Sequence, residues 1–463
     1  MLIYLLTLAP DLTWANASAD GGELITASVT LGIPHPPGYP TYILLGKLFS
    51  FIPVGTIAFR FNLFSAVCMA LATGLLAMTI VQQERTSTPS RLIGMAAALT
   101  FAFTPLVWSQ AVVAEVYALN MLMVSAFLFL LLRRGVNIGS GLFLGLALTT
   151  HLTAVFLIPL AIFLPVKRNW SRFIWGMGLG LLPLLVLPLL ATGKSPVVWG
   201  DPTNIKGWLW LVSGRLYSAN IQFPPDINRA LMLLQAIVVG PGLMLISRRN
   251  NWRTNRELLF PITTERRTRG VLAVSITLYV VFALLYTTSD AAVLLLPALL
   301  MLAILGASLL NPLKAGALLI PLLLLVSVFP GQNQRGGSDA REIAESILRS
   351  APEGAILMAP GDRTIFTLWY FQHVEHQRPD IYLVDSNLFA FEWYRARLGA
   401  QFPKLIVPVE DDLAAFRTEN SDNHAFCSVG LVHLPFKSNG HDLFGGPIPE
   451  QITPQLACME INP

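Results

Sequence analysis

Long apolar runs separated by short polar connections dominate roughly the first 330 residues of the chain. A run of about 20 apolar residues is long enough to cross the hydrocarbon core of a bilayer. Such runs predict membrane helices at about 60–81, 91–108, 112–132, 172–192, 228–247, 270–288, 291–309 and 314–330.

Two further segments complete the helical pattern. The stretch 139–166 is too long for one simple helix and contains the polar Thr149-Thr150-His151, so it predicts two short helices. Residues 15–19 are small, as before a signal-peptide cleavage site, but no basic segment precedes the apolar N-terminus. We therefore expect Leu2–Pro10, about half the spanning length, to be the outer half of an incomplete first helix. The total is about 11 membrane helices.

From Gly331 the composition changes to that of a soluble domain. Helical spacing over 339–349 and 364–376 alternates with short apolar strands at 355–359 and 381–384, which indicates a small α/β unit. The predicted fold is an all-α polytopic membrane domain, residues 1–330, followed by a small extracytoplasmic α/β domain, residues 331–463.

Composition supports a membrane protein and excludes several other classes. Apolar residues make up 54% of the chain and charged residues 13%, against roughly a quarter charged in soluble domains. The net charge of +4 gives no sign of nucleic-acid binding. No P-loop, dinucleotide fingerprint or zinc spacing occurs, which argues against a nucleotide-driven pump and a nicotinamide enzyme, and no metal ligands are predicted. Cys427 and Cys458 can pair only if the C-terminal domain lies outside the cytosol.

Loop charges predict the topology. Arg133-Arg134, Lys167-Arg168 with Arg172, and the arginines between 248 and 269 fall on one side of the membrane, which the positive-inside rule assigns to the cytoplasm. The opposite, outer side then collects the candidate functional residues Asp20, Glu23, His35, Glu115, Asp201, Arg215 and Asp290, together with the C-terminal domain.

The first outer loop, residues 11–58, is the candidate catalytic loop. If Asp20 begins a helix that runs to Leu31, the carboxylates of Asp20 and Glu23 lie on one face of it. The structural alternative is a capping-box variant, in which the two acids only start the helix. A loop with four prolines between 34 and 40 follows, and its restricted backbone suits a preorganised pocket. Residues 41–52 then predict a short helix lying in the membrane interface.

Further residues are candidates for substrate binding, each with a structural alternative. His35 could contact a phosphate or be a solvated loop histidine, and Tyr39 could anchor the loop at headgroup depth. Glu115 lies in an apolar run, where an acid is either functional or paired. Arg60 could clamp a substrate phosphate or reach lipid phosphate. Asp201 and Arg215 belong to an outer loop rich in ordinary turn residues. His151 could line the cavity or only hydrogen-bond a neighbouring helix, and Asp290 is a cavity acid or a helix-boundary residue.

The N-terminal motifs resemble those of a known family. Leu8-Ala9-Pro10, Asp20-Gly21-Gly22-Glu23-Leu24-Ile25 and Gly32-Ile33-Pro34-His35-Pro36-Pro37-Gly38-Tyr39-Pro40 are similar to the signature of bacterial multi-pass proteins related to a eukaryotic transmembrane protein O-mannosyltransferase. Further similarity lies at Arg60, Glu115-Val116-Tyr117, Trp199-Gly200-Asp201-Pro202, Gly361-Asp362-Arg363-Thr364 and Leu368-Trp369-Tyr370. The resemblance extends to about Tyr394, and residues 400–463 carry no motif of this family.

The resemblance implies a GT-C fold and a lipid-phosphate sugar donor, with an acid of the first outer loop as the base. On this basis we expect an inverting glycosyltransferase that moves a sugar, mannose in the first instance, from a polyprenyl phosphate to a hydroxyl at the outer membrane face. Asp20 is the expected base, with Glu23 as its neighbour or alternate. His35, Arg60 and Arg215 would neutralise the leaving phosphate. The acceptor would be a protein or a cell-surface glycan.

Three features depart from the family pattern, and two other functions stay open. The expected first membrane helix is incomplete, Gly21 stands where a serine is common, and the helical repeats that follow the membrane domain of the eukaryotic relative are missing. The last departure bears on the acceptor more than on the fold. A polytopic transporter or lipid-linked-sugar flippase would also bury acids in a helical bundle, but should show inverted repeats. A non-catalytic assembly scaffold would tolerate neutral substitutions at both acids.

Overall fold

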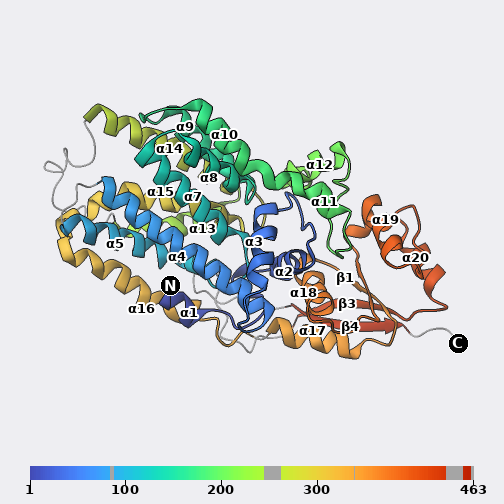
Figure 1. The fold of residues 1–463 in the computed structure, drawn as a ribbon. Helices are drawn as coiled ribbons and strands as arrows, with labels where there is room; N and C mark the ends of the chain where they lie inside the picture. The colour runs from blue at the N-terminus through green and yellow to red at the C-terminus, as the bar shows by residue number, and fades with distance from the viewer. Residues whose placement is uncertain (84–87, 245–261, 338, 434–451, 460–463) are drawn as a thin grey trace.

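The computed structural model describes residues 1–83, 88–244, 262–337, 339–433 and 452–459. Figure 1 shows an elongated molecule in which apolar helices occupy one end and a small sheet with its helices occupies the other. We call the described residues up to Gln332 the membrane region and those from Asp339 onward the C-terminal region. Helices α2 and α3 lie where the two regions meet, and this position places the first outer loop between them.

Five helical stretches are long and apolar enough to cross a membrane, so the predicted class of a helical membrane protein is confirmed. They are α4 (Ile57–Gln83), α7 (Val116–Arg134), α10 to α11 (Trp170–Ala191), α14 (Ile262–Leu285) and the run from Ala291 to Gln332 that contains α15 (Leu296–Gly306) and α16 (Leu319–Gln332). Shorter apolar helices are α5 (Thr88–Ala102), α8 (Ile138–Leu148), α9 (Ile158–Phe163) and α13 (Ile227–Val238).

One difference from the sequence prediction is explained by a proline, and another lies at the start of α7. The helix expected over 91–108 is broken, because α5 ends at Ala102 and the short α6 (Pro105–Ser109) begins at a proline, which disfavours helical backbone at the preceding residue. The helix expected from 112 begins only at Val116. The two short helices predicted in 139–166 are present as α8 and α9, and α1 (Leu2–Thr7) is the only helical portion of the apolar N-terminus.

The basic loops within the described ranges meet at one end of the membrane region. Helix α7 has 19 residues, about 28 Å at 1.5 Å per residue, and it leads from Glu115 at one end to Arg133-Arg134 at the other. Val136 N–H donates to the Lys167 carbonyl at 2.8 Å, and Arg267 Nε donates to the Phe163 carbonyl at 3.1 Å. Arg248, Arg249, Arg253 and Arg256 lie outside the described residues.

The C-terminal region contains the predicted α/β unit and extends it. Helix α17 (Asp339–Ser350), strand β1 (Ile356–Ala359), helix α18 (Asp362–His373) and strand β2 (Tyr382–Asp385) occur as expected. Helices α19 (Glu392–Gln401) and α20 (Leu413–Asn420) and strands β3 (Phe426–His433) and β4 (Ile452–Met459) follow. The strand order is β2-β1-β3-β4, with β1 parallel to both neighbours and β4 antiparallel to β3.

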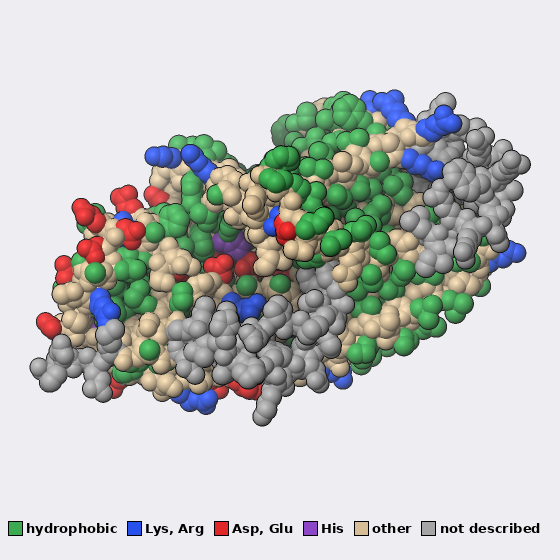
Figure 2. Space-filling model, turned by 180° about the vertical axis from the view of Figure 1, so that it is seen from behind, with side chains coloured by type: hydrophobic (Ala, Val, Ile, Leu, Met, Phe, Trp, Pro, Cys, Tyr) green, Lys and Arg blue, Asp and Glu red, His purple; other side chains and the backbone are tan. Residues whose placement is uncertain are grey.

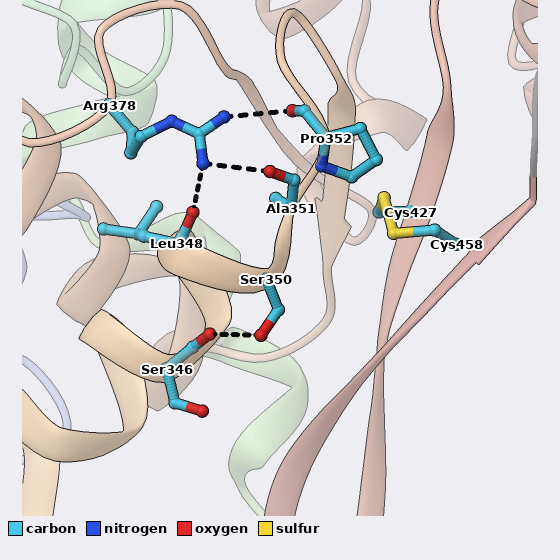
Figure 3. The surroundings of a disulfide bond; sticks show 8 residues. All are labelled: Ser346, Leu348, Ser350, Ala351, Pro352, Arg378, Cys427 and Cys458. Carbon is cyan, nitrogen blue, oxygen red and sulfur yellow. Dashed lines mark hydrogen bonds between the residues drawn. A yellow bond between two sulfur atoms is a disulfide. The ribbon is translucent and has the colours of Figure 1, made fainter.

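A disulfide bond joins the last two strands. Cys427 and Cys458 are opposite each other in the β3–β4 register and are bonded to each other. Figure 3 shows the bond beside the turn at Ala351-Pro352, whose carbonyls accept hydrogen bonds from Arg378 at 2.9 and 3.0 Å. The pairing that the sequence left open is therefore formed, and it fixes β4 to the sheet.

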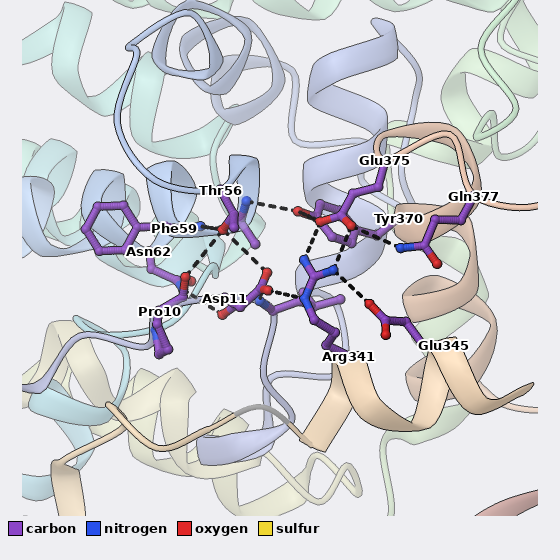
Figure 4. A network of polar contacts seen from close by, with 12 residues as sticks. Pro10, Asp11, Thr56, Phe59, Asn62, Arg341, Glu345, Tyr370, Glu375 and Gln377 are labelled. Atoms are coloured by element: carbon purple, nitrogen blue, oxygen red, sulfur yellow. Dashed lines mark hydrogen bonds and ion pairs between the residues drawn. The ribbon is translucent and has the colours of Figure 1, made fainter. Parts of the chain in front are cut away.

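Ion pairs and hydrogen bonds attach the C-terminal region to the first outer loop (Figure 4). Arg341 Nε of α17 donates to Asp11 at 2.5 Å, and its two terminal nitrogens donate to the carboxylate of Glu375 at 2.5 and 2.8 Å. Tyr370 of α18 accepts a hydrogen bond from the Ala58 N–H at 3.2 Å and donates to Glu375 at 3.0 Å. These charge-assisted bonds are partly buried, so they hold the two regions more firmly than exposed pairs would.

Helices α2 (Gly21–Thr30) and α18 pack directly against each other across the boundary between the two regions. A Cβ atom added at Gly22 would lie 2.3 Å from the Phe366 carbonyl oxygen, well inside van der Waals contact. Glycine at position 22 therefore lets the two helix backbones touch, and the start of α2 is held against the C-terminal region.

We expect Gly22→Ala to lower the free energy of unfolding by about 1–3 kcal/mol, because the methyl group must push α18 away. Thermal unfolding in detergent checks this. Gly74→Ala is the matched control, since an added Cβ at that exposed position of α4 meets no atom within 4 Å. Equal melting temperatures for the two variants would contradict the close packing of α2 on α18.

Candidate active site

A cavity of about 480 Å³ opens where the first outer loop, the ends of the membrane helices and the C-terminal region meet. This size is ordinary for a small-molecule site. Figure 2 shows a hollow on this side of the molecule, with a histidine and acidic side chains exposed in it. The lining includes Asp20, His35, Tyr39, Tyr117, His151, Trp199, Arg215, Tyr217, Tyr286, Asp290, Asp362 and Phe366.

Asp20 lines this cavity from the N-terminus of α2. The predicted helix from Asp20 to Leu31 is present, with Asp20 at the N-cap position and Leu31 at the C-cap. The Asp20 side chain makes no capping hydrogen bond, and its carboxylate lies 3.7 Å from His35 Nε2. The capping-box alternative therefore does not describe this helix, and the carboxylate is left facing the cavity.

Glu23 points away from the cavity into a fully buried hydrogen-bond network. Its carboxylate contacts His35 Nδ1 at 2.5 Å, accepts from the His35 backbone N–H at 3.2 Å and accepts from Trp199 Nε1. Its side chain is 0% exposed, and it is not among the described residues that line the cavity. Glu23 thus orients the imidazole, whose Nε2 lies 2.9 Å from the Tyr39 hydroxyl.

Backbone pairing brings Trp199 to Glu23 across 176 residues of sequence. Ile33 N–H donates to the Val197 carbonyl at 2.8 Å, and Trp199 N–H donates to the Ile33 carbonyl at 3.0 Å. The pairing is close because position 32 is glycine: an added Cβ would lie 2.2 Å from the Val197 carbonyl oxygen. Trp393 and Phe366 of the C-terminal region contact the Trp199 ring, with centroids at 6.0 and 6.4 Å.

Burial and charge set the protonation of Asp20 and His35. Burial raises the pKa of the Asp20 carboxyl to about 6, with the charge of His35 opposing the rise and those of Glu23 and Asp290 adding to it. Burial lowers the pKa of His35, but the carboxylates of Glu23 and Asp20 outweigh burial and raise it to about 10. At neutral pH the site therefore holds an imidazolium beside a carboxylate that is ready to take up a proton.

Other lining residues come from the membrane region. Arg215, in the turn after α12 (Ile205–Val212), is the only lysine or arginine in the cavity lining within the described residues. The Tyr117 hydroxyl donates to Asp290 at 3.2 Å. His151 lines the cavity and hydrogen-bonds the Thr153 hydroxyl at 2.8 Å. Of the two alternatives open for each residue, the cavity wall is where both His151 and Asp290 are found.

Besides Glu23, three sequence candidates lie outside the cavity wall. Arg60 donates to the carbonyls of Ser50, Val54 and Gly55 at 2.6, 3.0 and 3.4 Å, so it holds the turn between α3 (Pro40–Ser50) and α4. Asp201 is exposed and accepts from Thr203 and Asn204 in its own turn. Glu115 is buried at the start of α7, and its Oε2 has no hydrogen-bond partner among the described residues.

The structure adds Asp362, Phe366 and Tyr217 to the site. Asp362 and Phe366 lie one turn apart on α18, and the Phe366 ring is stacked on His35 with centroids 6.5 Å apart. No spacing relates these residues to Asp20 in the sequence, and the family motif at 361–364 was the one available signal. Among the described residues, no group of three or more His, Cys, Asp or Glu side chains is arranged to hold a metal ion.

Family models and curated relatives that match this chain carry the same family name. The family model "Protein O-mannosyl-transferase TMEM260 N-terminal domain" matches residues 20–174, and "TMEM260-associated domain 2" matches residues 340–422. The chain is 27% identical over 458 residues to the mouse (Mus musculus) protein O-mannosyl-transferase TMEM260, covering 88% of this chain and 64% of the mouse protein. It is 30% identical over 132 residues to the Dictyostelium discoideum protein O-mannosyl-transferase tmem260, covering 28% of this chain and 15% of that protein. The chain thus spans somewhat less than two thirds of the mouse protein.

Solved structures show the fold. ArnT from Cupriavidus metallidurans bound to undecaprenyl phosphate superposes with a TM-score of 0.54 at 13% identity, covering 92% of this chain and 91% of ArnT. The apo form of ArnT gives a TM-score of 0.50 at 14% identity, with 94% of each chain covered. The expected GT-C-like fold is confirmed by this likeness.

We expect His35 to remain protonated at pH 7 and Glu23→Gln to bring its pKa down toward or below the ordinary value of 6.5, because burial then acts with less opposing charge. Histidine NMR in micelles measures this, with Glu410→Gln, an exposed acid, as the control. Since the folded pKa is the higher one, stabilisation by charged His35 should be complete below about pH 6.5 and lost as the pH rises through about 10. An unshifted His35 in Glu23→Gln would contradict the pairing.

Proposed function

Because the chain is related to the protein O-mannosyl-transferase TMEM260 family and has a GT-C-like fold, we propose that it is a membrane glycosyltransferase. It transfers a sugar, mannose in the first instance, from a polyprenyl phosphate to a hydroxyl group at the outer membrane face. The observation that carries this proposal is the Asp20 carboxylate, which faces a cavity of about 480 Å³ that also contains one arginine.

Arg215 and His35 supply the positive charge that a departing lipid phosphate needs. Charge that develops on the leaving group is stabilised most by preoriented donors in a partly desolvated site. The imidazole is held by Glu23 and Tyr39 on its two nitrogens. Apolar residues of the membrane region, Leu152, Ile221 and Phe282 among them, line the same cavity and suit the lipid end of a donor. The undecaprenyl phosphate bound to ArnT supports a donor of this class.

Asp20 acts as the general base in this proposal. It accepts the proton of the acceptor hydroxyl while the acceptor oxygen bonds to the anomeric carbon and the bond from that carbon to the phosphate oxygen breaks. A base works best with a pKa near the working pH, and burial raises the pKa of Asp20 toward that range. Glu23 has its oxygens occupied by three donors, so we assign it the positioning of His35 instead of proton transfer.

The proposed topology has the cavity and residues 331–463, which include the C-terminal region, outside the cytoplasm. The basic ends of α7, α10 and α14 lie at the end of the membrane region far from Glu115, as the positive-inside rule requires of the cytoplasmic side. The disulfide between Cys427 and Cys458 is typical of an oxidising compartment. A protein serine or threonine hydroxyl is the proposed acceptor, in keeping with the names of the relatives.

Asp20→Asn should reduce transfer of mannose from a polyprenyl-phosphate donor by about 10²–10⁴-fold, because the amide cannot accept the proton. Radiolabelled transfer by the purified protein measures this. The exposed Asp422→Asn serves as the control, and an unchanged melting temperature shows that Asp20→Asn is folded. Full activity in a folded Asp20→Asn variant would reject Asp20 as the base.

The transfer rate should rise with pH and level off above about pH 6, where Asp20 becomes ionised. His35→Gln removes a positive charge that favours the carboxylate, so the acidic limb of the residual activity should move to higher pH. The pH dependence of kcat/KM for wild type and variant tests both statements. If the acidic limb of the kcat/KM profile has the same pKa in His35→Gln as in wild type, a group other than Asp20 is responsible for that limb.

Cys427 and Cys458 should react with a membrane-impermeant maleimide in intact cells only after reduction, because they are paired and lie outside the cytoplasm. Cys68→Ser provides the background control, since Cys68 is the free cysteine and is buried. Labelling without a reducing agent would contradict the pairing. Labelling that needs cell lysis would contradict the topology.

A further inference from the structure

Asp362 extends into the active-site cavity from the C-terminal region. It occupies the first position of α18, and Phe366, four residues later on the same helix face, lines the cavity beside it. The α18 backbone is held against Gly22, and Trp14 Nε1 donates to Thr367 at 2.9 Å. The position of Asp362 relative to Asp20 is therefore set by packing on both sides of the cavity.

The Asp362 carboxylate is free to bind a ligand. In the stretch of chain that the structure describes, it forms no hydrogen bond or ion pair with another residue. An acid in the first turn of a helix also favours the helix dipole, which is the structural alternative for this residue. A residue that only stabilises the helix dipole need not line a cavity. Asp362 does line one, together with Asp20, His35 and Arg215.

The two sides of the cavity differ in what they can bind. Asp290 and Arg215 come from segments of the membrane region, the side from which the proposed lipid-linked donor would enter. Asp362 comes from the C-terminal region and is coupled electrostatically to Asp20, which in turn is coupled to Asp290. Asp20 is thus the carboxylate that interacts with both sides. A general base that deprotonates the acceptor, so that the acceptor oxygen can attack the donor, must lie between the two substrates.

We propose that Asp362 is an acceptor-binding residue: its carboxylate accepts a hydrogen bond from an N–H or O–H group next to the hydroxyl that Asp20 deprotonates. This inference rests on the proposed transferase function. In this proposal the C-terminal region binds the acceptor and does not merely cover the cavity. The assignment also defines the acceptor class, a peptide whose reacting serine or threonine has hydrogen-bond donors beside it and no neighbouring acidic side chain, because Asp20 and Asp362 would repel one.

Kinetics with a polyprenyl-phosphate mannose donor and a synthetic peptide with one threonine test the assignment. Asp362→Asn should raise the acceptor KM about tenfold or more, since a hydrogen bond to a charged group is lost or weakened. The donor KM and the melting temperature should stay as in wild type. Asp422→Asn, an exposed acid of the same region, is the matched control and should change none of these quantities.

The outcomes separate this inference from the function on which it depends. Transfer by wild type with an unchanged acceptor KM in Asp362→Asn would overturn the role of Asp362 alone. A fall in melting temperature without a change in acceptor KM would support the helix-dipole role and also overturn it. Absence of transfer by wild type and Asp422→Asn alike would overturn the proposed function, and this inference with it.

A peptide pair provides a second, independent measurement. Replacing the neutral neighbour of the threonine by aspartate should raise the acceptor KM for wild type, and this penalty should shrink several-fold in Asp362→Asn because one repelling carboxylate is removed. An equal penalty in both proteins would overturn the assignment. Lysine at the same peptide position should bind wild type better than Asp362→Asn.

Discussion

The contact between Glu23 and His35 is the interaction on which the rest of the site depends. A carboxylate with no exposure to solvent is costly unless it is paired and hydrogen-bonded. Glu23 meets that requirement with the His35 ring, the His35 backbone and the Trp199 indole. The same bonds hold the proline-rich loop against α2, direct the free ring nitrogen toward Tyr39 and Asp20, and tie the first outer loop to the loop that carries Trp199.

The C-terminal region completes this arrangement from the other side. Phe366 and Trp393 cover Trp199 and His35, and the Arg341 network with Asp11 and Glu375 fixes the boundary between the two regions. Shielding of the loop from water raises the pKa of Asp20. The C-terminal region thereby contributes to the chemistry through burial as well as through Asp362. Burial by the C-terminal region is thus one physical cause of the raised pKa of Asp20.

Local signals in the sequence predicted most of the secondary structure and some of the site. Asp20 opens the helix that its spacing with Glu23 indicated, the short helix expected over 41–52 occurs as α3, and the alternation of α17, β1, α18 and β2 follows the expected pattern. One error lies at Pro105, where proline interrupts an apolar run, because hydrophobic length alone does not report a break in the helix.

Apolar length in the sequence alone determined that this is a helical membrane protein, and the sequence also placed two acids, Asp20 and Glu23, in the connection after the first apolar segment, because such properties belong to a single segment. Tertiary structure alone decided which candidates share a cavity. Arg60 donates hydrogen bonds to carbonyls of its own turn, and Asp201 accepts one from the Thr203 hydroxyl. The Glu23 side chain points away from the cavity and contacts His35. Asp362 reaches the cavity of Asp20 across more than 300 residues of sequence, through helix packing at Gly22 that no local pattern encodes.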